Sequence, residues 1–167
     1  MAFLIGEKTV TVDGKNRLRL PTEMRKLLGE KFDGRFVIRK NEILNCLEIF
    51  PQFLWEKAIE EKLAKYDVAF GDHQDIIHLM LKGTDFAELD SEGVRITLPA
   101  DMLKFAKIGE EGTLVGAKDF FGFWNPEQYI SYNQGLETRR KQLLEMYSEV
   151  NASSGNNIGN GNRPPNQ

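Results

Sequence analysis

The chain is short of the residues that build several kinds of site. It has 167 residues but a single cysteine, Cys46. One cysteine excludes a disulfide within the chain, and we interpret Cys46 as a small residue of a core strand. No apolar stretch approaches the roughly 18 residues that a membrane-spanning helix needs. Residues 1–10 show no charged leader before a long apolar core. The sequence therefore predicts a soluble protein of the reducing cytoplasm.

The sequence also lacks a convergent set of catalytic groups. The two histidines, His73 and His78, lie five positions apart in an expected linker helix, with no cysteine or paired carboxylates at ligand spacing. No glycine-rich loop of the P-loop kind occurs. We therefore predict that the protein is not an enzyme, holds no metal or cofactor, and takes no small-molecule substrate.

What the sequence does contain is a repeat. Residues 12–26 are VDGKNRLRLPTEMRK, and residues 89–104 are LDSEGVRITLPADMLK. Five residues of the first segment recur 78 positions later: Arg17, Leu20, Pro21, Met24 and Lys26. The segments 47–55 and 121–129 match in the same order at an offset of 74. Two matched blocks in order indicate a duplicated unit. Because units of about 70 residues bury only a thin core, we expect the copies to pack on each other or in a homo-oligomer.

Charge is unevenly distributed along the chain. The net charge is -3, yet residues 1–40 hold ten Lys and Arg against five Asp and Glu, and the remainder holds twelve against twenty. A nucleic-acid-binding protein needs a positive charge only on its docking face, so this asymmetry is compatible with DNA binding. Ordinary variation of surface charge is an equally good interpretation of composition alone.

Periodicity and turn residues predict the same elements in both copies. In the first copy we expect a hairpin of strands 8–12 and 17–20 around a turn at 13–16, a helix over 22–28, and strands 35–39 and 44–50. In the second copy we expect strands 86–89, 95–98, 113–117 and 120–124 with a helix over 100–106. Between the copies, helices are expected from Pro51 and over 76–81.

A closing helix is expected to follow the second copy. Asn125 is a suitable N-cap and Pro126 suits the first helical position. The predicted buried face comprises Tyr129, Tyr132, Leu136, Leu143 and Tyr147. Gly135 weakens the helix by about 1 kcal/mol relative to Ala, which favours a break there. Residues 151–167 are rich in Asn, Gly, Ser and Pro, and we expect a disordered tail.

The first hairpin carries the candidate binding residues. Side chains alternate along a strand, so Arg17 and Arg19 point one way while the leucines beside them face the core. Lys15 lies at the turn just before them. These three cations could meet phosphates, and Arg could also contact guanine through its two-pronged donor geometry. Asp13 is suited to organising the turn through backbone amides. The alternative is a solvated hairpin face with no binding role.

The run VDGKNRLRLPTEMRK resembles the DxKGRxxxP signature of the MraZ family, whose members are tandem proteins of the AbrB/SpoVT swapped-hairpin superfamily. The likeness extends to LIGEKTV at the start, LEIFPQFLWEKAIEEKL at the end of the first unit, IIHLMLKGTDFAELDSEG before the second signature, and FGFWNPEQY after it. It covers about residues 3–147. Both copies and their aromatic closing segments occur in the family's order.

The resemblance implies an α+β fold of two tandem AbrB/SpoVT-like swapped-hairpin β-barrel units with short helices, related by a pseudo-two-fold axis. The expected boundaries are 1–50 for the first unit, 51–84 for a helical linker, 85–125 for the second unit, 126–150 for the C-terminal helix and 151–167 for the tail.

In function, the resemblance implies a bacterial, nucleoid-associated transcriptional regulator, usually a repressor. Such proteins bind direct repeats of double-stranded DNA ahead of the division and cell-wall gene cluster, and assemble into closed rings. The family's DNA-contacting positions fall on Lys15 and Arg17, with Asp13 organising the loop. The strand alternation above adds Arg19.

Two departures from the family pattern affect the loops. Asn16 replaces the signature glycine, and Asn tolerates a left-handed backbone less freely than Gly. In the second copy an extra residue lies between Asp90 and Arg95, and Glu92 stands at the lysine position. We therefore expect the second loop to serve the fold or a subunit contact. The rival function is an antitoxin-like protein-interaction module of the same superfamily, although the tail lacks the apolar residues that such a segment needs to fold on a partner.

Overall fold

The two copies have the same order of elements in the structure, a computed structural model that describes residues 3–155. The first copy consists of β1 (Glu7–Thr11), β2 (Arg17–Arg19), α1 (Thr22–Leu27), β3 (Arg35–Asn41) and β4 (Cys46–Pro51). The second consists of β5 (Thr84–Glu88), β6 (Arg95–Thr97), α4 (Ala100–Phe105), β7 (Glu111–Gly116) and β8 (Phe121–Trp124). The linker contains α2 (Gln52–Leu63) and α3 (Gly71–Leu81). The expected strands and helices of both copies are therefore present.

The copies exchange strands with each other. The main sheet has the order β1-β7-β8-β4-β3-β5, so the first strand of each copy pairs with the third strand of the other. Since β1 and β5 lie at opposite edges and are not joined, the sheet is open. The prediction of closed β-barrels was wrong, because β2 and β6 leave this sheet and form a separate two-stranded ribbon.

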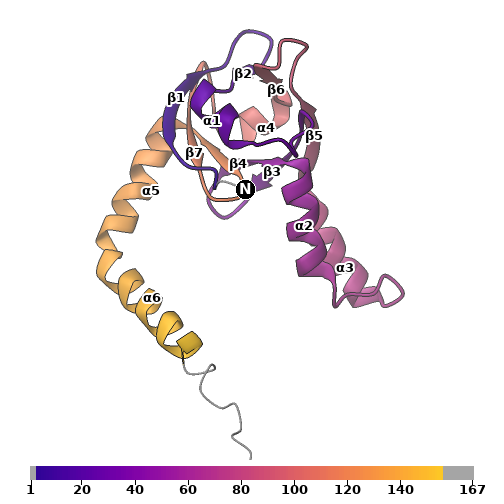
Figure 1. Cartoon of the computed structure of the whole chain (residues 1–167), viewed down its shortest axis with the longest axis vertical. Helices are drawn as coiled ribbons and strands as arrows, with labels where there is room; N and C mark the ends of the chain where they lie inside the picture. Colours follow the sequence, from indigo (N-terminus) through magenta and orange to yellow (C-terminus); the bar gives the residue numbers. More distant parts are fainter. Residues whose placement is uncertain (1–2, 156–167) are drawn as a thin grey trace, which may run out of the picture. The chain divides into compact units, whose positions relative to one another are not determined.

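The ribbon of β2 and β6 relates the two copies (Figure 1). Leu18 pairs with Ile96, its own equivalent in the repeat, and both side chains are fully buried. Beyond the strands, the Leu20 amide donates to the Val94 carbonyl at 3.0 Å. The Leu98 amide donates to the Asn16 carbonyl at 2.8 Å on the other side. These contacts make the ribbon the centre of the internal symmetry.

The strands β1 and β2 form the expected hairpin only next to the turn, without a continuous ladder of paired residues. A single bridge, between Val12 and Leu18, joins the two strands next to the turn. Beyond it β1 pairs with β7, whereas β2 pairs with β6. The strands diverge because each finds its main partner in the second copy, which local periodicity in the sequence does not reveal.

One face of the main sheet carries the larger core. Leu47 and Ile49 of β4 face it together with Leu18 and Ile96 of the ribbon. The short helices α1 and α4 contribute Met24 and Met102, and the residues after the ribbon strands contribute Leu20 and Leu98, so that both pairs are equivalent in the repeat. A smaller cluster on the other face contains Val37, Phe50 and Trp55, against which Ile59 and Phe120 pack. The sheet thus has a ribbon-bearing face and a second face next to α2.

The closing helix follows Asn125, whose side-chain oxygen accepts from the amides of residues 127 and 128 at 2.9 and 3.1 Å. It consists of α5 (Pro126–Thr138) and α6 (Arg140–Gly155), with the break at Arg139 rather than at Gly135. Tyr129 is buried, but Tyr147 is exposed, so its assignment to the buried face was wrong. The helix ends at residue 155, beyond the expected boundary at 150, and the remainder of the expected tail lies outside the described residues.

The ribbon packing leads to a stability prediction. Ile96→Ala should lower the free energy of unfolding by about 2–5 kcal/mol, because it removes a fully buried side chain from the contact between the copies. Thr97→Ala, an exposed change on the same strand, should cost less than about 1 kcal/mol. Urea unfolding followed by circular dichroism measures both. Equal effects of the two changes would contradict the role of the ribbon.

Candidate nucleic-acid interface

The first loop is shaped by Asp13. One carboxylate oxygen, Oδ1, accepts from the backbone amides of Lys15 at 2.9 Å and Arg17 at 3.0 Å. The Asp13 carbonyl accepts from the Asn16 amide at 2.9 Å, which closes a four-residue turn. Asn16 has φ 59°, a left-handed conformation that Asn adopts more readily than most residues. The side chain of Asp13 therefore holds the backbone of the loop in one shape.

Arg17 is positioned by the same carboxylate. Its Nε lies 2.8 Å from Asp13 Oδ2, and about a third of the arginine side chain is exposed. Among the described residues, the two terminal nitrogens of the guanidinium have no protein acceptor. An arginine fixed at Nε with free terminal donors is preorganised for an external acceptor such as a phosphate or a base edge.

Hydrogen bonds lower the pKa of Asp13. The backbone amide of Arg17 is the largest cause, and the Arg17 side chain and the Lys15 amide act in the same direction. Because the folded-state pKa lies below the ordinary Asp value of about 3.9, the ionised carboxylate stabilises this loop above that pH. The contribution is lost as the pH falls through the lowered pKa, and it is present in full at neutral pH.

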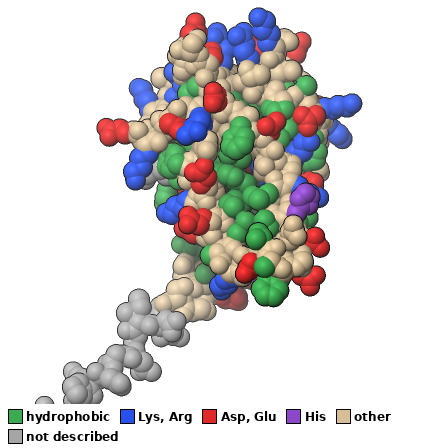
Figure 2. Space-filling model, turned by 90° about the vertical axis from the view of Figure 1, so that its right-hand side faces the viewer, with side chains coloured by type: hydrophobic (Ala, Val, Ile, Leu, Met, Phe, Trp, Pro, Cys, Tyr) green, Lys and Arg blue, Asp and Glu red, His purple; other side chains and the backbone are tan. Residues whose placement is uncertain are grey.

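Lys15 and Arg19 complete the basic surface of the first loop. Both are exposed, and neither has an ion-pair partner within residues 3–155. Arg19 stands on the outer side of the ribbon, since Leu18 and Leu20 on either side of it are buried. Both loops project at the top of the molecule in Figure 1. Figure 2, which keeps that end uppermost, shows basic side chains gathered there.

The second loop repeats the backbone arrangement with different charges. Asp90 Oδ1 accepts from the amides of Val94 at 2.9 Å and Arg95 at 3.1 Å, and its carbonyl accepts from Gly93 at 2.8 Å. The guanidinium of Arg95, however, lies 2.9 Å from Glu92 Oε2 and 3.5 Å from Asp90 Oδ2. Glu92, then Asp90, raises the pKa of Arg95. Two carboxylates therefore share the arginine that corresponds to Arg17.

The extra residue of the second loop lies outside its turn. Each turn closes over four residues, from Asp13 to Asn16 and from Asp90 to Gly93. The additional residue is thus Val94, and Glu92 occupies the place of Lys15 in the turn. Asp, Lys and Arg in the first turn region give a net charge of +1, whereas Asp, Glu and Arg in the second give -1. One backbone design presents opposite charges in the two copies.

Comparison with known proteins agrees with this duplicated loop. A sequence profile of the family described as "MraZ protein, putative antitoxin-like" matches residues 3–71 and 80–147. The chain belongs to the MraZ family. The two matched segments are two tandem MraZ domains, which confirms the resemblance seen in the sequence.

Curated relatives of the MraZ family match most of the chain. A protein named transcriptional regulator MraZ from Desulforamulus reducens is 31% identical over 143 residues, which cover 86% of this chain and 96% of the relative. The protein of that name from Carboxydothermus hydrogenoformans is 31% identical over 86% of this chain and 95% of its own length. The one from Clostridium tetani is 30% identical over 89% and 99%.

Sequence reasoning missed Arg25 of α1. Its guanidinium donates to the Leu20 carbonyl at 3.1 Å, to the Gly93 carbonyl at 3.4 Å and to Thr22 Oγ1 at 3.0 Å. It therefore ties the helix of the first MraZ domain to the loop of the second. The sequence did contain a signal for Arg25, because the two copies differ at this position and the second copy has Leu103 there.

His73, one of the two histidines considered as metal ligands, has contacts with neighbouring residues of the linker. His73 Nδ1 accepts from the Asp67 amide at 3.0 Å, next to the rings of Tyr66 and Phe70. Across residues 3–155, His, Cys, Asp and Glu side chains form no group of three or more that could hold a metal ion. No helix in that range is both long enough and apolar enough to cross a membrane.

The Asp13 contacts lead to a prediction about loop order. Asp13→Ala should speed hydrogen exchange of the Lys15 and Arg17 amides roughly fivefold to tenfold, the factor expected for the loss of one hydrogen bond. Asp90→Ala should do the same only at Val94 and Arg95. Amide exchange measured by NMR near neutral pH separates the two loops. Unchanged exchange in Asp13→Ala would show that the carboxylate does not hold the loop.

Proposed function

We propose that the protein is a DNA-binding transcriptional regulator that docks the outer side of the β2–β6 ribbon and its first loop on double-stranded DNA. The observation that supports this proposal best is the set of donors on the first loop that have no protein acceptor within residues 3–155, with Arg17 held at Nε by Asp13. The names of the relatives, all transcriptional regulators, support the same function.

The proposed contacts follow from the chemistry of each side chain. A two-stranded ribbon fits the width of the major groove. Lys15 at the tip of the turn meets a phosphate as a point charge, while the terminal nitrogens of Arg17 suit the two acceptors of guanine or a phosphate. Arg19, farther along the ribbon, adds a phosphate contact. Asp13 and Asn16 keep the loop in the shape that presents these donors.

One basic loop per chain provides few contacts, so we propose that several copies act together. Exposed apolar side chains of the linker and β5 suit contacts between copies, including Val68 and Phe70 between α2 and α3, Leu79 on α3 and Phe86 on β5. Figure 2 shows hydrophobic side chains gathered on this side of the molecule. A homo-oligomer, as a closed ring, would place successive loops on successive direct repeats and sum their weak contacts through linked binding.

The finer biological assignments rest on the family. We propose that the strand exchange between the copies is the swapped hairpin of the AbrB/SpoVT superfamily, and that the five expected segments define the parts of this chain, with the C-terminal helix extended to residue 155. The regulated promoter would be that of the division and cell-wall gene cluster, with the protein acting as a nucleoid-associated repressor. A footprint of the protein on its own upstream DNA tests this, because protected direct repeats would give the partner, the spacing and the geometry together.

Antitoxin-like protein binding is the second candidate, since the family description contains that term. Binding of a protein partner would use a part of the surface other than the cations of the first loop. The two functions therefore separate in the variant described next.

Arg17→Ala should abolish binding to a promoter fragment that contains the repeats, because each copy in the assembly loses about 1–3 kcal/mol. The oligomer should stay intact, since the residue is partly exposed. The matched change Arg95→Ala should retain DNA binding, because carboxylates already occupy that arginine, and should mainly lower the melting temperature.

Gel shifts, sedimentation and thermal melting measure these outcomes. Affinity of the unmodified protein should fall steeply with salt concentration. Unchanged affinity in Arg17→Ala would remove the central assignment. Loss of DNA binding in Arg95→Ala at an unchanged melting temperature would show that the roles of the two copies were misjudged.

A further inference from the structure

Helix α4 of the second copy lies beside the first loop. The Leu98 amide donates to the Asn16 carbonyl at 2.8 Å, and α4 begins two residues after Leu98. Residues of the loop and of the helix line one depression, among them Asp13, Gly14, Asn16, Ala100, Leu103 and Lys104. The other copy therefore supplies the surface next to the loop that carries Lys15 and Arg17.

The first copy repeats this arrangement at the second loop. Arg25 of α1 donates to the Gly93 carbonyl at 3.4 Å, so α1 lies beside the second loop as α4 lies beside the first. Lys26 on α1 and Lys104 on α4 are identical residues 78 positions apart in the repeat. Each lysine therefore belongs to a helix that neighbours the loop of the other copy.

Lys104 is an exposed cation whose side chain forms no hydrogen bond or ion pair within residues 3–155. The acid of the same helix, Asp101, lies 2.8 Å from Lys40 Nζ and is thus already paired. Lys104 therefore keeps an uncompensated charge next to the first loop. A free ammonium beside a loop with free donors extends the basic surface on which a polyanion can dock.

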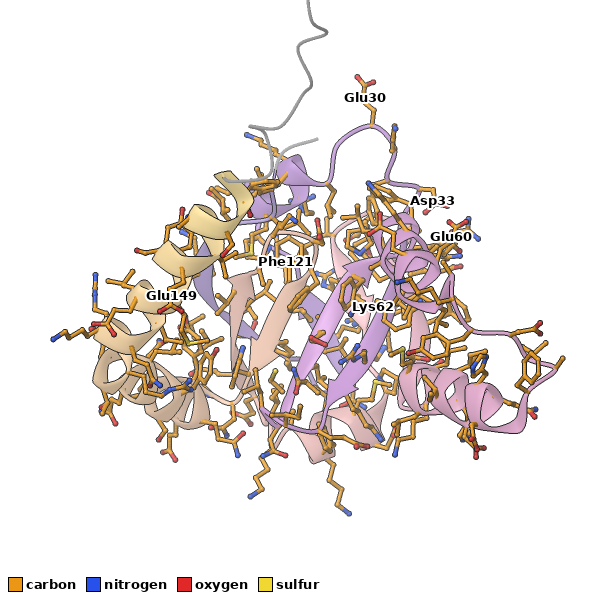
Figure 3. The ribbon with its side chains drawn as sticks, turned by 90° about the horizontal axis from the view of Figure 1, so that it is seen from below. Glu30, Asp33, Glu60, Lys62, Phe121 and Glu149 are labelled. Carbon is orange, nitrogen blue, oxygen red and sulfur yellow. The ribbon has the colours of Figure 1, made fainter. Side chains whose placement is uncertain are left out.

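Other cations outside the first loop are less suitably placed. Arg95 is shared by two carboxylates of its own loop. Lys107 follows α4 but does not line the depression. Lys62 of α2, labelled in Figure 3, lines a different depression on the second face of the sheet. Of these four cations, only Lys104 is both free of a protein partner and next to the first loop.

We propose that Lys104 is a further DNA-contacting residue, which binds a phosphate of the duplex that the first loop holds. This contact rests on the proposed DNA-binding function, and it makes the docking surface a composite of the two copies. A lysine meets a phosphate as a point charge, so the contact adds affinity without preference for a base sequence. The equivalent Lys26 has no such role, because Glu92 makes its neighbouring loop repel phosphate.

Two other charges face the same depression and modulate the contact. Asp13 is paired with Arg17, whereas Glu110 is exposed and has no ion pair within the described residues. The charge of Glu110 opposes that of Lys104. Glu110→Gln should therefore strengthen DNA binding roughly twofold. Weaker binding in Glu110→Gln would contradict a phosphate contact at this place.

Lys104→Ala and Lys26→Ala form a matched pair, since each removes the same exposed side chain from an equivalent helix. Lys104→Ala should weaken binding to a promoter fragment that contains the repeats roughly fivefold, and binding to a scrambled fragment by a similar factor. Lys26→Ala should leave both affinities unchanged. Gel shifts of the full-length protein measure these affinities, and sedimentation checks that the assemblies keep the same size.

The dependence on salt separates a phosphate contact from a structural role. The slope of log affinity against log salt concentration should fall by about 0.9 for every Lys104 that contacts DNA. Lys104→Arg keeps the charge and should restore both the slope and the affinity. A structural role of the lysine would lower the melting temperature and leave the slope as it is, which would overturn the assignment.

The outcomes also distinguish this contact from the proposed function. Equal affinity and equal salt slope in Lys104→Ala and Lys26→Ala, with DNA binding lost in Arg17→Ala, would overturn the role of Lys104 alone. Absence of promoter binding by the unmodified protein would overturn the proposed function, and the contact with it. A fivefold loss confined to Lys104→Ala supports both.

Discussion

The antiparallel contact between β2 and β6 is the constraint on which the rest of the molecule depends. Leu18 and Ile96 are equivalent residues that bury against each other at its centre, and the backbone bonds from Leu20 to Val94 and from Leu98 to Asn16 extend it on both sides. Because each loop directly precedes a ribbon strand, this contact also fixes where the loops stand. The main sheet also needs both copies, since β1 pairs with β7 and β5 pairs with β3. Neither copy has a complete sheet without the other.

The two loops show how a duplicated scaffold can separate shape from charge. Asp13 and Asp90 each bond the amide of the loop arginine through Oδ1 and accept the bond that closes the turn at their carbonyl, so the turn is retained in both copies. The divergence lies in what surrounds the arginine: Arg17 has one carboxylate at Nε, whereas Arg95 is shared by two. A single substitution site, Lys15 in one copy and Glu92 in the other, largely sets this difference. The retained turn preserves the packing of the second loop. Glu92 in place of the lysine makes that loop unsuited to binding polyanions.

Much of this arrangement was predictable from the sequence because it is local. Alternation placed Leu18 and Leu20 in the core and Arg17 and Arg19 outside, and the turn residues located the loop. The partners of the strands were not predictable, because pairing of β1 with β7 joins segments about a hundred residues apart and leaves no periodic signal. The β-barrel prediction failed for that reason, and the expected hairpin is reduced to the bridge between Val12 and Leu18. Arg25 was missed because a carbonyl of the second copy, Gly93, decides its role. Tyr147 fits the helical spacing of the predicted buried face, yet its side chain is exposed.

The two faces of the sheet place different demands on buried charge. On the ribbon side, the ionised groups are near solvent, and Asp13 keeps a lowered pKa through backbone donors. On the other side, burial, followed by the charge of Glu48, raises the pKa of Cys46 to about 12. A carboxylate in such surroundings is expensive unless it gains partners. Arg39 offsets part of this cost by charge alone, and an apolar residue at position 48 would have avoided it. The pair of Glu48 and Arg39 therefore lowers the cost of the buried carboxylate without making it a net source of stability.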